Sequence, residues 1–209
     1  MLLVLPFLLG AGDQPQEEGA TPQEAAQAPD YFPLAVGNCW EYDATYRLTT
    51  GNSLNATATL TIEGLEPING REYYKAVGRV SGVLGNPTTT KYYRSTATGI
   101  LEADKRNGGA EFLLLPIPLT AHKKWTVELP DELFFGKIKA RQQATMGWKV
   151  TCDNLVFSDC VLIASTVETR LGSGQHEQWL APNIGIVRQK QACKLWTMES
   201  VLRKFAKGR

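Results

Sequence analysis

The chain has 209 residues, of which 43% are hydrophobic and 21% charged, and its formal net charge is +1. This length has room for one large domain or two small ones, and the composition is ordinary for a globular protein. The chain has no stripe that combines basic and aromatic residues, and its basic excess is small. Nucleic acid is therefore not expected as a partner.

The first twelve residues, MLLVLPFLLGAG, form an apolar run that ends in small residues. Gly10 and Gly12 stand three and one positions before a possible cleavage point at Asp13, as in a secretory signal peptide, although a positively charged start is missing. The run is too short to cross a bilayer, so no transmembrane span is expected. Residues 1–12 thus predict export to the periplasm, the envelope or the cell exterior. The alternative is an apolar start to a cytoplasmic protein.

Residues 13–30 contain only Gln, Glu, Asp, Ala, Pro, Gly and Thr. None of these side chains buries enough apolar surface to offset the entropy of ordering the segment, which predicts a disordered linker. We expect a single folded domain over residues 31–209.

After the linker the sequence has the pattern of β-strands. Residues 40–48, WEYDATYRL, place Trp, Tyr, Ala, Tyr and Leu at alternate positions, the period of a half-buried strand. Later segments are rich in Thr, Val, Tyr and Ile and are separated by turn signals such as EPING and LGNP. The last segment, KLWTMESVLRKF, fits a strand or a helix, and we favour a strand. The sequence predicts an all-β antiparallel fold of about ten strands, as an open or closed barrel or, alternatively, a two-sheet sandwich.

Two parts of the chain share landmarks at nearly one offset. Pro-Leu, five residues and Trp occur in 33–40 and again in 118–125, 85 positions later. Tyr93 precedes Gly99-Ile100 as Trp179 precedes Gly185-Ile186, at an offset of 86. We interpret this as a possible internal repeat of residues 33–100 in 118–186. We therefore expect the repeated aromatics to pack in the core, with a ligand-binding groove as the alternative: Trp40, Tyr93, Trp125 and Trp179.

These landmarks also carry a resemblance. YFPLAVGNCWEY, YYRSTATGI, LLLPIPL and WLAPNIGIV resemble a loosely defined, largely uncharacterised group of secreted bacterial envelope proteins with PLxxGNxW and APGxGxV signatures. Asn183 stands where that group usually has Gly, and Cys39 occupies a position where that group usually has a small, polar residue. The resemblance implies export and a β fold but no activity. The open-barrel lipoprotein carriers are a more distant analogy, based on architecture alone.

Four cysteines are present: Cys39, Cys152, Cys160 and Cys193. An even number in an exported protein suggests disulfides, and four cysteines allow three connectivities. Cys152 and Cys160 flank DNLVFSD, a turn-rich link between two strands, so we expect these two to pair. Cys39–Cys193 would follow only by elimination. No spacing fits a zinc site, and neither a metal nor a cofactor is expected.

Few residues could carry catalysis. The chain has two histidines, and His176 is followed by Glu177, but adjacent strand residues point to opposite faces. We expect His176 and His122 to be solvated. No nucleophile elbow, phosphate-binding loop or HExxH motif occurs.

The sequence therefore favours an exported, non-enzymatic envelope protein that binds an apolar small molecule or another envelope component. A hydrolase with an unrecognised pair of carboxylates and a purely structural module are the alternatives.

We predict that the linker is dispensable for folding. A chain that begins at Asp30 should keep the thermal midpoint of one that begins at Asp13, because residues 13–29 hold no side chain able to pack. Calorimetry of the two chains tests this, and a midpoint lower by several degrees in the shorter chain would contradict it.

Overall fold

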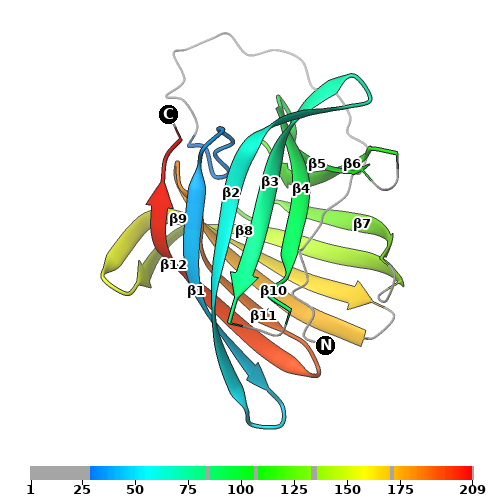
Figure 1. The fold of residues 1–209 in the computed structure, drawn as a ribbon. Coiled ribbons are helices and arrows are strands. Elements are labelled where there is room, and N and C mark those ends of the chain that lie inside the picture. The colour runs from blue at the N-terminus through cyan, green and yellow to red at the C-terminus, as the bar shows by residue number, and fades with distance from the viewer. Residues whose placement is uncertain (1–28, 83–84, 106–107, 133–135, 170–171, 209) are drawn as a thin grey trace.

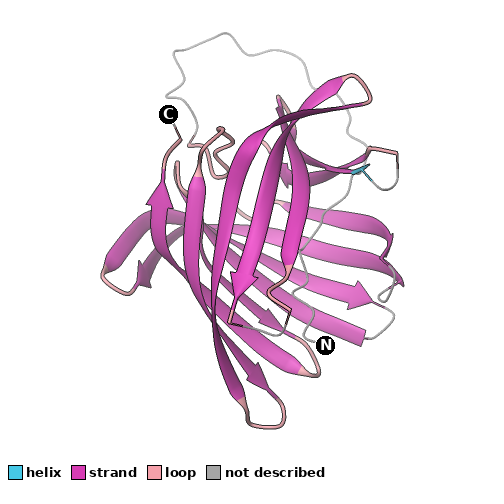
Figure 2. Ribbon diagram, viewed as in Figure 1, coloured by secondary structure: helices cyan, strands magenta, loops and turns pink. Residues whose placement is uncertain are grey.

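A computed structural model describes residues 29–82, 85–105, 108–132, 136–169 and 172–208 (Figure 1). Strands make up nearly all of its regular structure (Figure 2). The predicted signal-like segment, 1–12, and all but the last two residues of the predicted linker, 13–30, lie outside the described residues.

Twelve antiparallel strands follow one another along the chain. They are β1 (Cys39–Leu48), β2 (Ser53–Ile68), β3 (Arg71–Ser81), β4 (Thr88–Thr96), β5 (Gly99–Asp104), β6 (Ala110–Pro116), β7 (Lys124–Glu132), β8 (Gly136–Cys152), β9 (Leu155–Thr169), β10 (Gly172–Ala181), β11 (Gly185–Ala192) and β12 (Trp196–Ala206).

All twelve strands belong to one sheet, in the order β6-β5-β4-β3-β2-β1-β12-β11-β10-β9-β8-β7. Consecutive strands pair as hairpins, and β1 pairs with β12, so the sheet curls into a nearly closed barrel (Figure 1). The strands β6 and β7 end the sheet and are not hydrogen-bonded to each other. This confirms the predicted all-β barrel, while the sandwich alternative is wrong. The apolar stretch EFLLLP forms most of β6.

Alternation along each strand separates an inner from an outer face. On β1 the buried residues are Trp40, Tyr42, Ala44 and Tyr46, with half-buried polar residues between them. We call the face that carries these buried side chains the inner face. The long hairpin of β2 and β3 is closed by a tight turn. Its two central residues, Asn69 and Gly70, both have positive φ, at 50° and 75°. A two-residue hairpin turn of type I′ requires this conformation.

The stretches YFPLAVGNCWEY and WLAPNIGIV, which we call the signature stretches, meet at one end of the barrel, the signature end. The indole Nε1 of Trp40 donates to the carbonyl of Ile184 at 2.5 Å, and the Asn183 amide N–H donates to the carbonyl of Asp30 at 2.6 Å. Asn183 has a φ of 60°. This lies in the left-handed region, which Gly and Asn tolerate best. Asn183 can therefore adopt this conformation with little strain.

Asn38, also in the first signature stretch, joins three segments. It is 1% exposed, and its side-chain amide donates to the carbonyl of Pro33 at 3.0 Å. Its Oδ1 accepts from the amide of Gly208 at 2.8 Å, and its backbone carbonyl accepts from Ile62 at 2.9 Å. The N-terminal segment, β2 and the end of the chain are therefore fixed to one another by a single buried residue.

The two parts of the proposed repeat occupy comparable places in the meander. Trp40 and Trp125 are each the second residue of their strands, β1 and β7. Gly99 and Gly185 each begin a strand, β5 and β11. The duplication of 33–100 in 118–186 stays a prediction.

The predicted Cys152–Cys160 disulfide is wrong, because all four cysteines are free thiols. The register of β8 and β9 gives the reason: Cys152 lies opposite Leu155, whereas Cys160 lies opposite Trp148, four residues earlier on β8. A disulfide needs Cα atoms within about 7 Å of each other. The Cys152 thiol instead donates to the carbonyl of Val187 at 3.1 Å.

Replacement of the two leading tryptophans should have unequal effects. Trp40 is 5% exposed and stacks on Phe205 with ring centroids 5.2 Å apart, whereas Trp125 is half-buried. Trp40→Ala should lower the free energy of unfolding by about 3–5 kcal/mol, and Trp125→Ala should lower it by less. Urea denaturation measures both, and an equal or larger loss for Trp125→Ala would contradict this packing.

Candidate ligand-binding interior

A row of polar side chains crosses the inner face of the second half of the barrel. Each residue lies directly opposite the next on the neighbouring strand, so the row follows the hydrogen-bonding direction of the sheet from β7 to β11. We call it the inner row, and its members are Trp125, Gln142, Ser165, His176 and Gln191. The last four are buried, with exposures of 1–7%.

A second, shorter set of polar residues lies beside the inner row. Gln178, Gln189 and Ser200 face one another across β10, β11 and β12. Ser200 is 2% exposed. The sequence contained a signal for part of both sets, since some of these polar residues stand two positions from buried apolar ones. Thus Gln142 lies between Ala140 and Ala144, and Ser200 between Met198 and Leu202.

The hydrogen bonds of these side chains are incomplete. The Gln142 Nε2 donates to Ser165 Oγ at 2.8 Å, while Gln142 Oε1 has no hydrogen-bond partner in the described part of the chain. Because Ser165 Oγ can also donate, turning the amide over would only exchange the paired and unpaired ends. Within the same described residues, Ser200 Oγ and Trp125 Nε1 also lack partners. A buried polar group without a partner costs about 1–3 kcal/mol.

His176 is 1% exposed, so the expectation that it is solvated is wrong. Burial lowers the pKa of His176 to about 3, and a hydrogen bond with Gln189 partly opposes this shift. The imidazole is therefore neutral near pH 7. Glu177 faces the other side of the sheet, as strand alternation predicted. His122, by contrast, is exposed.

The first half of the barrel contributes one buried ion pair to the inner face. Lys91 on β4 and Glu102 on β5 lie 2.8 Å apart, with side chains 14% and 3% exposed. Glu102 is the sole acidic residue among the buried residues of the described ranges. The hydrolase alternative needs two opposed carboxylates, and the buried side chains described do not supply such a pair.

The gap in the sheet between β6 and β7 is closed by side chains. Phe112 and Leu114 of β6 pack against a buried cluster on the opposite strands, which consists of Val127, Ile138, Ala140 and Val167. Trp125, the first member of the inner row, packs against the same cluster. We call this contact the seam. It is apolar, and it lies directly beside the polar inner row.

The signature end of the barrel is filled. Trp40 and Tyr93 are 5% and 8% exposed, and Phe32 packs edge-on against Tyr93 with ring centroids 5.2 Å apart. The space between these rings amounts to only about 10 Å³. Trp179 is 8% exposed and lies beneath the cationic groups of Arg188 and Lys190, at 5.6 and 5.9 Å from its ring.

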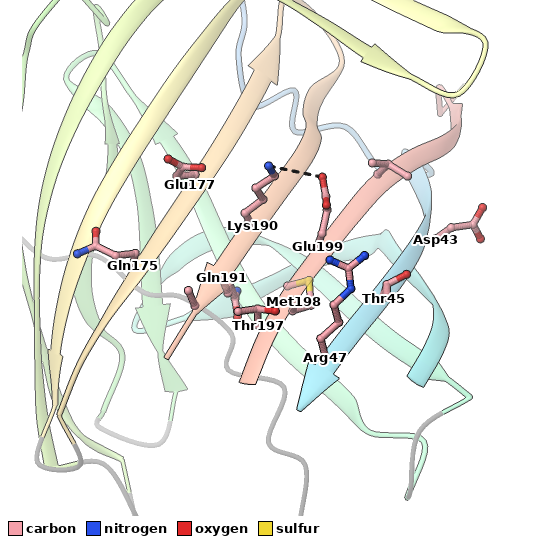
Figure 3. A pocket seen from close by; sticks show the side chains of 12 residues that line it. Asp43, Thr45, Arg47, Gln175, Glu177, Lys190, Gln191, Thr197, Met198 and Glu199 are labelled. Atoms are coloured by element: carbon pink, nitrogen blue, oxygen red, sulfur yellow. Dashed lines mark ion pairs between the residues drawn. The ribbon is translucent and has the colours of Figure 1, made fainter. Parts of the chain in front are cut away.

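The outer face of β10, β11, β12 and β1 is hollowed into a groove of about 510 Å³ (Figure 3). Acidic and basic side chains alternate along it, and Lys190 reaches toward Glu199 at 3.9 Å. Glu199 also accepts hydrogen bonds from Arg188. These charges largely neutralise one another, so the groove carries no strong field of one sign.

Neither a metal-binding cluster nor a membrane-spanning helix occurs within the described ranges. The residues described there include no group of three or more His, Cys, Asp or Glu arranged to hold a metal ion. Among those same residues, no helix is long and apolar enough to cross a membrane.

Comparison with known proteins identifies relatives by fold. No protein-family profile and no curated sequence matches the chain. A candidate lipoprotein from Parabacteroides distasonis matches with a TM-score of 0.56 and 15% identity, and a candidate exported protein with a YmcC-like fold from Bacteroides fragilis with 0.53 and 14%. Each match covers 86% of this chain and 100% of the other. At these identities the similarity concerns the fold alone.

The buried imidazole should make stability depend on pH. Because the pKa of His176 falls from about 6.5 in the unfolded chain to about 3 in the folded protein, the unfolded chain binds the proton first as pH falls. Between pH 7 and pH 5 this group should remove about 2 kcal/mol from the free energy of unfolding. His176→Gln should abolish that loss, and His122→Gln should not. The free energy of unfolding, measured by urea denaturation at a series of pH values, tests this. The same pH dependence for wild type and His176→Gln would contradict the burial of a neutral His176.

Proposed function

We propose that this chain is an exported, non-enzymatic envelope protein whose barrel holds an apolar small molecule. The observation that carries the proposal is the seam, where the sheet stops pairing and apolar side chains of β6 and β7 meet instead. Docking to another envelope protein is the alternative, and the experiments below separate the two.

Export is supported by two independent features. Residues 1–12 have the apolar run and small-residue end of a signal peptide. The two fold relatives are described as a candidate exported protein and a candidate lipoprotein. The proposed membership in the group of secreted envelope proteins rests on the signature stretches alone.

The seam is suited to admitting a ligand because opening it breaks no backbone ladder. Between all other neighbouring strands, hydrogen bonds join the backbones. At the seam the contact is made by Phe112 and Leu114 against Val127 and its neighbours. Apolar contacts are not directional, so an alkyl chain can replace them without leaving a polar group unpaired.

The proposal predicts a lipid that copurifies with the protein. Extraction of the purified chain with organic solvent, followed by untargeted mass spectrometry, should recover one lipid class near one equivalent per chain. The control is an unrelated secreted protein purified identically. Recovery no greater than from that control would contradict the proposal and favour a structural module or a protein partner.

A dye assay locates the site at the seam. N-phenyl-1-naphthylamine, an uncharged apolar dye, should bind delipidated protein and gain fluorescence. Leu114→Trp, which overfills the seam, should weaken that binding at least fivefold. Leu195→Trp, at a position that is 66% exposed, should leave it unchanged. Equal effects of the two substitutions would place the dye elsewhere.

A further inference from the structure

The inner row leads directly to the seam. Trp125 lies on β7, the last strand of the sheet, and its cross-strand neighbour is Gln142 on β8. Trp125 also packs against the apolar cluster that β6 covers. A molecule that enters between β6 and β7 would therefore meet apolar side chains and the first polar residues of the row together.

Two of the polar atoms that lack partners within the described residues belong to the members of the inner row nearest the seam. Trp125 Nε1 can only donate, and it has no acceptor among the described residues. Gln142 is 4% exposed and has one amide end unpaired in the same described part of the chain. A group that both donates and accepts would complete both side chains, and a hydroxyl does so whichever way the amide is turned.

The charge of the interior restricts the ligand further. His176, the fourth member of the inner row, is neutral near pH 7. The one buried acidic residue described, Glu102, is already paired with Lys91 at 2.8 Å. A charged group placed beside the row would lose its hydration without gaining an opposite charge, which is costly.

From these contacts we propose that the inner row binds the head group of an amphiphile, and that this head group is uncharged and carries hydroxyls. Trp125 and Gln142 bond the hydroxyls, while the alkyl chain lies against the apolar cluster at the seam. This inference rests on the proposed function and specifies the class of ligand.

Three probes with the same eight-carbon chain test it: n-octyl β-D-glucoside, octanoate and octyltrimethylammonium. Titration calorimetry of the delipidated protein, below the micelle concentration of each probe, measures affinity. The glucoside should bind at least tenfold more tightly than either charged probe. Similar affinities for all three would overturn the inference about the head group while leaving the proposed apolar site intact.

Matched variants assign the contacts. Gln142→Met should weaken glucoside binding about tenfold, and Lys149→Met, at an exposed position of the same strand, should leave it unchanged. Trp125→Phe keeps a ring at the seam but removes the N–H, and it should also weaken binding. Trp148→Phe, at a position 42% exposed, is its control.

The thermal midpoint separates binding from folding. Gln142→Met removes an unpaired buried end together with one hydrogen bond, so its midpoint should stay within a few degrees of wild type. If the Gln142→Met protein does not fold, the glucoside affinity of Trp125→Phe alone tests the inference. Unchanged glucoside affinity in a folded Gln142→Met or Trp125→Phe protein would overturn the inference. Failure of all three probes and of the apolar dye to bind would overturn the proposed function itself.

Discussion

The pairing of β1 with β12 is the contact on which the rest of the structure depends. It joins the first strand to the last, with Cys39 opposite Ala206 and Leu48 opposite Trp196. Without it the strands would form two separate meanders, and the inner face would have nothing to pack against. Closing so long a loop costs conformational entropy. Burial of Trp40 against Phe205 offsets more of that cost than the exposed Arg203–Glu41 pair does, because exposed ion pairs contribute little.

The interior that this pairing creates is divided into unlike regions. At the signature end, aromatic rings and Asn38 leave almost no free space. Farther along, the second half of the barrel places amides, hydroxyls and an imidazole on its inner face. A core built for stability alone would fill these positions with apolar side chains, since each unpaired polar atom lowers stability. The proposed binding of a polar head group would compensate for this loss of stability.

Local patterns in the sequence predicted the fold class well, because strand alternation and turn residues act over a few positions. The alternation at Trp40, Tyr42, Ala44 and Tyr46 is an example. The burial of His176 was missed because binary patterning assigns polar residues to the outer face. The Cys152–Cys160 pairing failed for a different reason: the chain reverses within two residues, Asp153 and Asn154, so that Cys152 lies opposite Leu155 rather than Cys160. The inner row itself depends on the registers of four strand pairs and was beyond sequence reasoning.

The unpaired margins of β6 and β7 have a further consequence. An edge strand offers a row of backbone donors and acceptors that another chain can join, which is a common origin of aggregation. Here the two margins lie against each other, so each shields its counterpart behind Phe112 and Leu114. Any widening of this contact uncovers both margins at once. Under the proposed function, loading and release of the ligand would coincide with the moments when the protein is most prone to self-association, and a bound alkyl chain would protect it from aggregation.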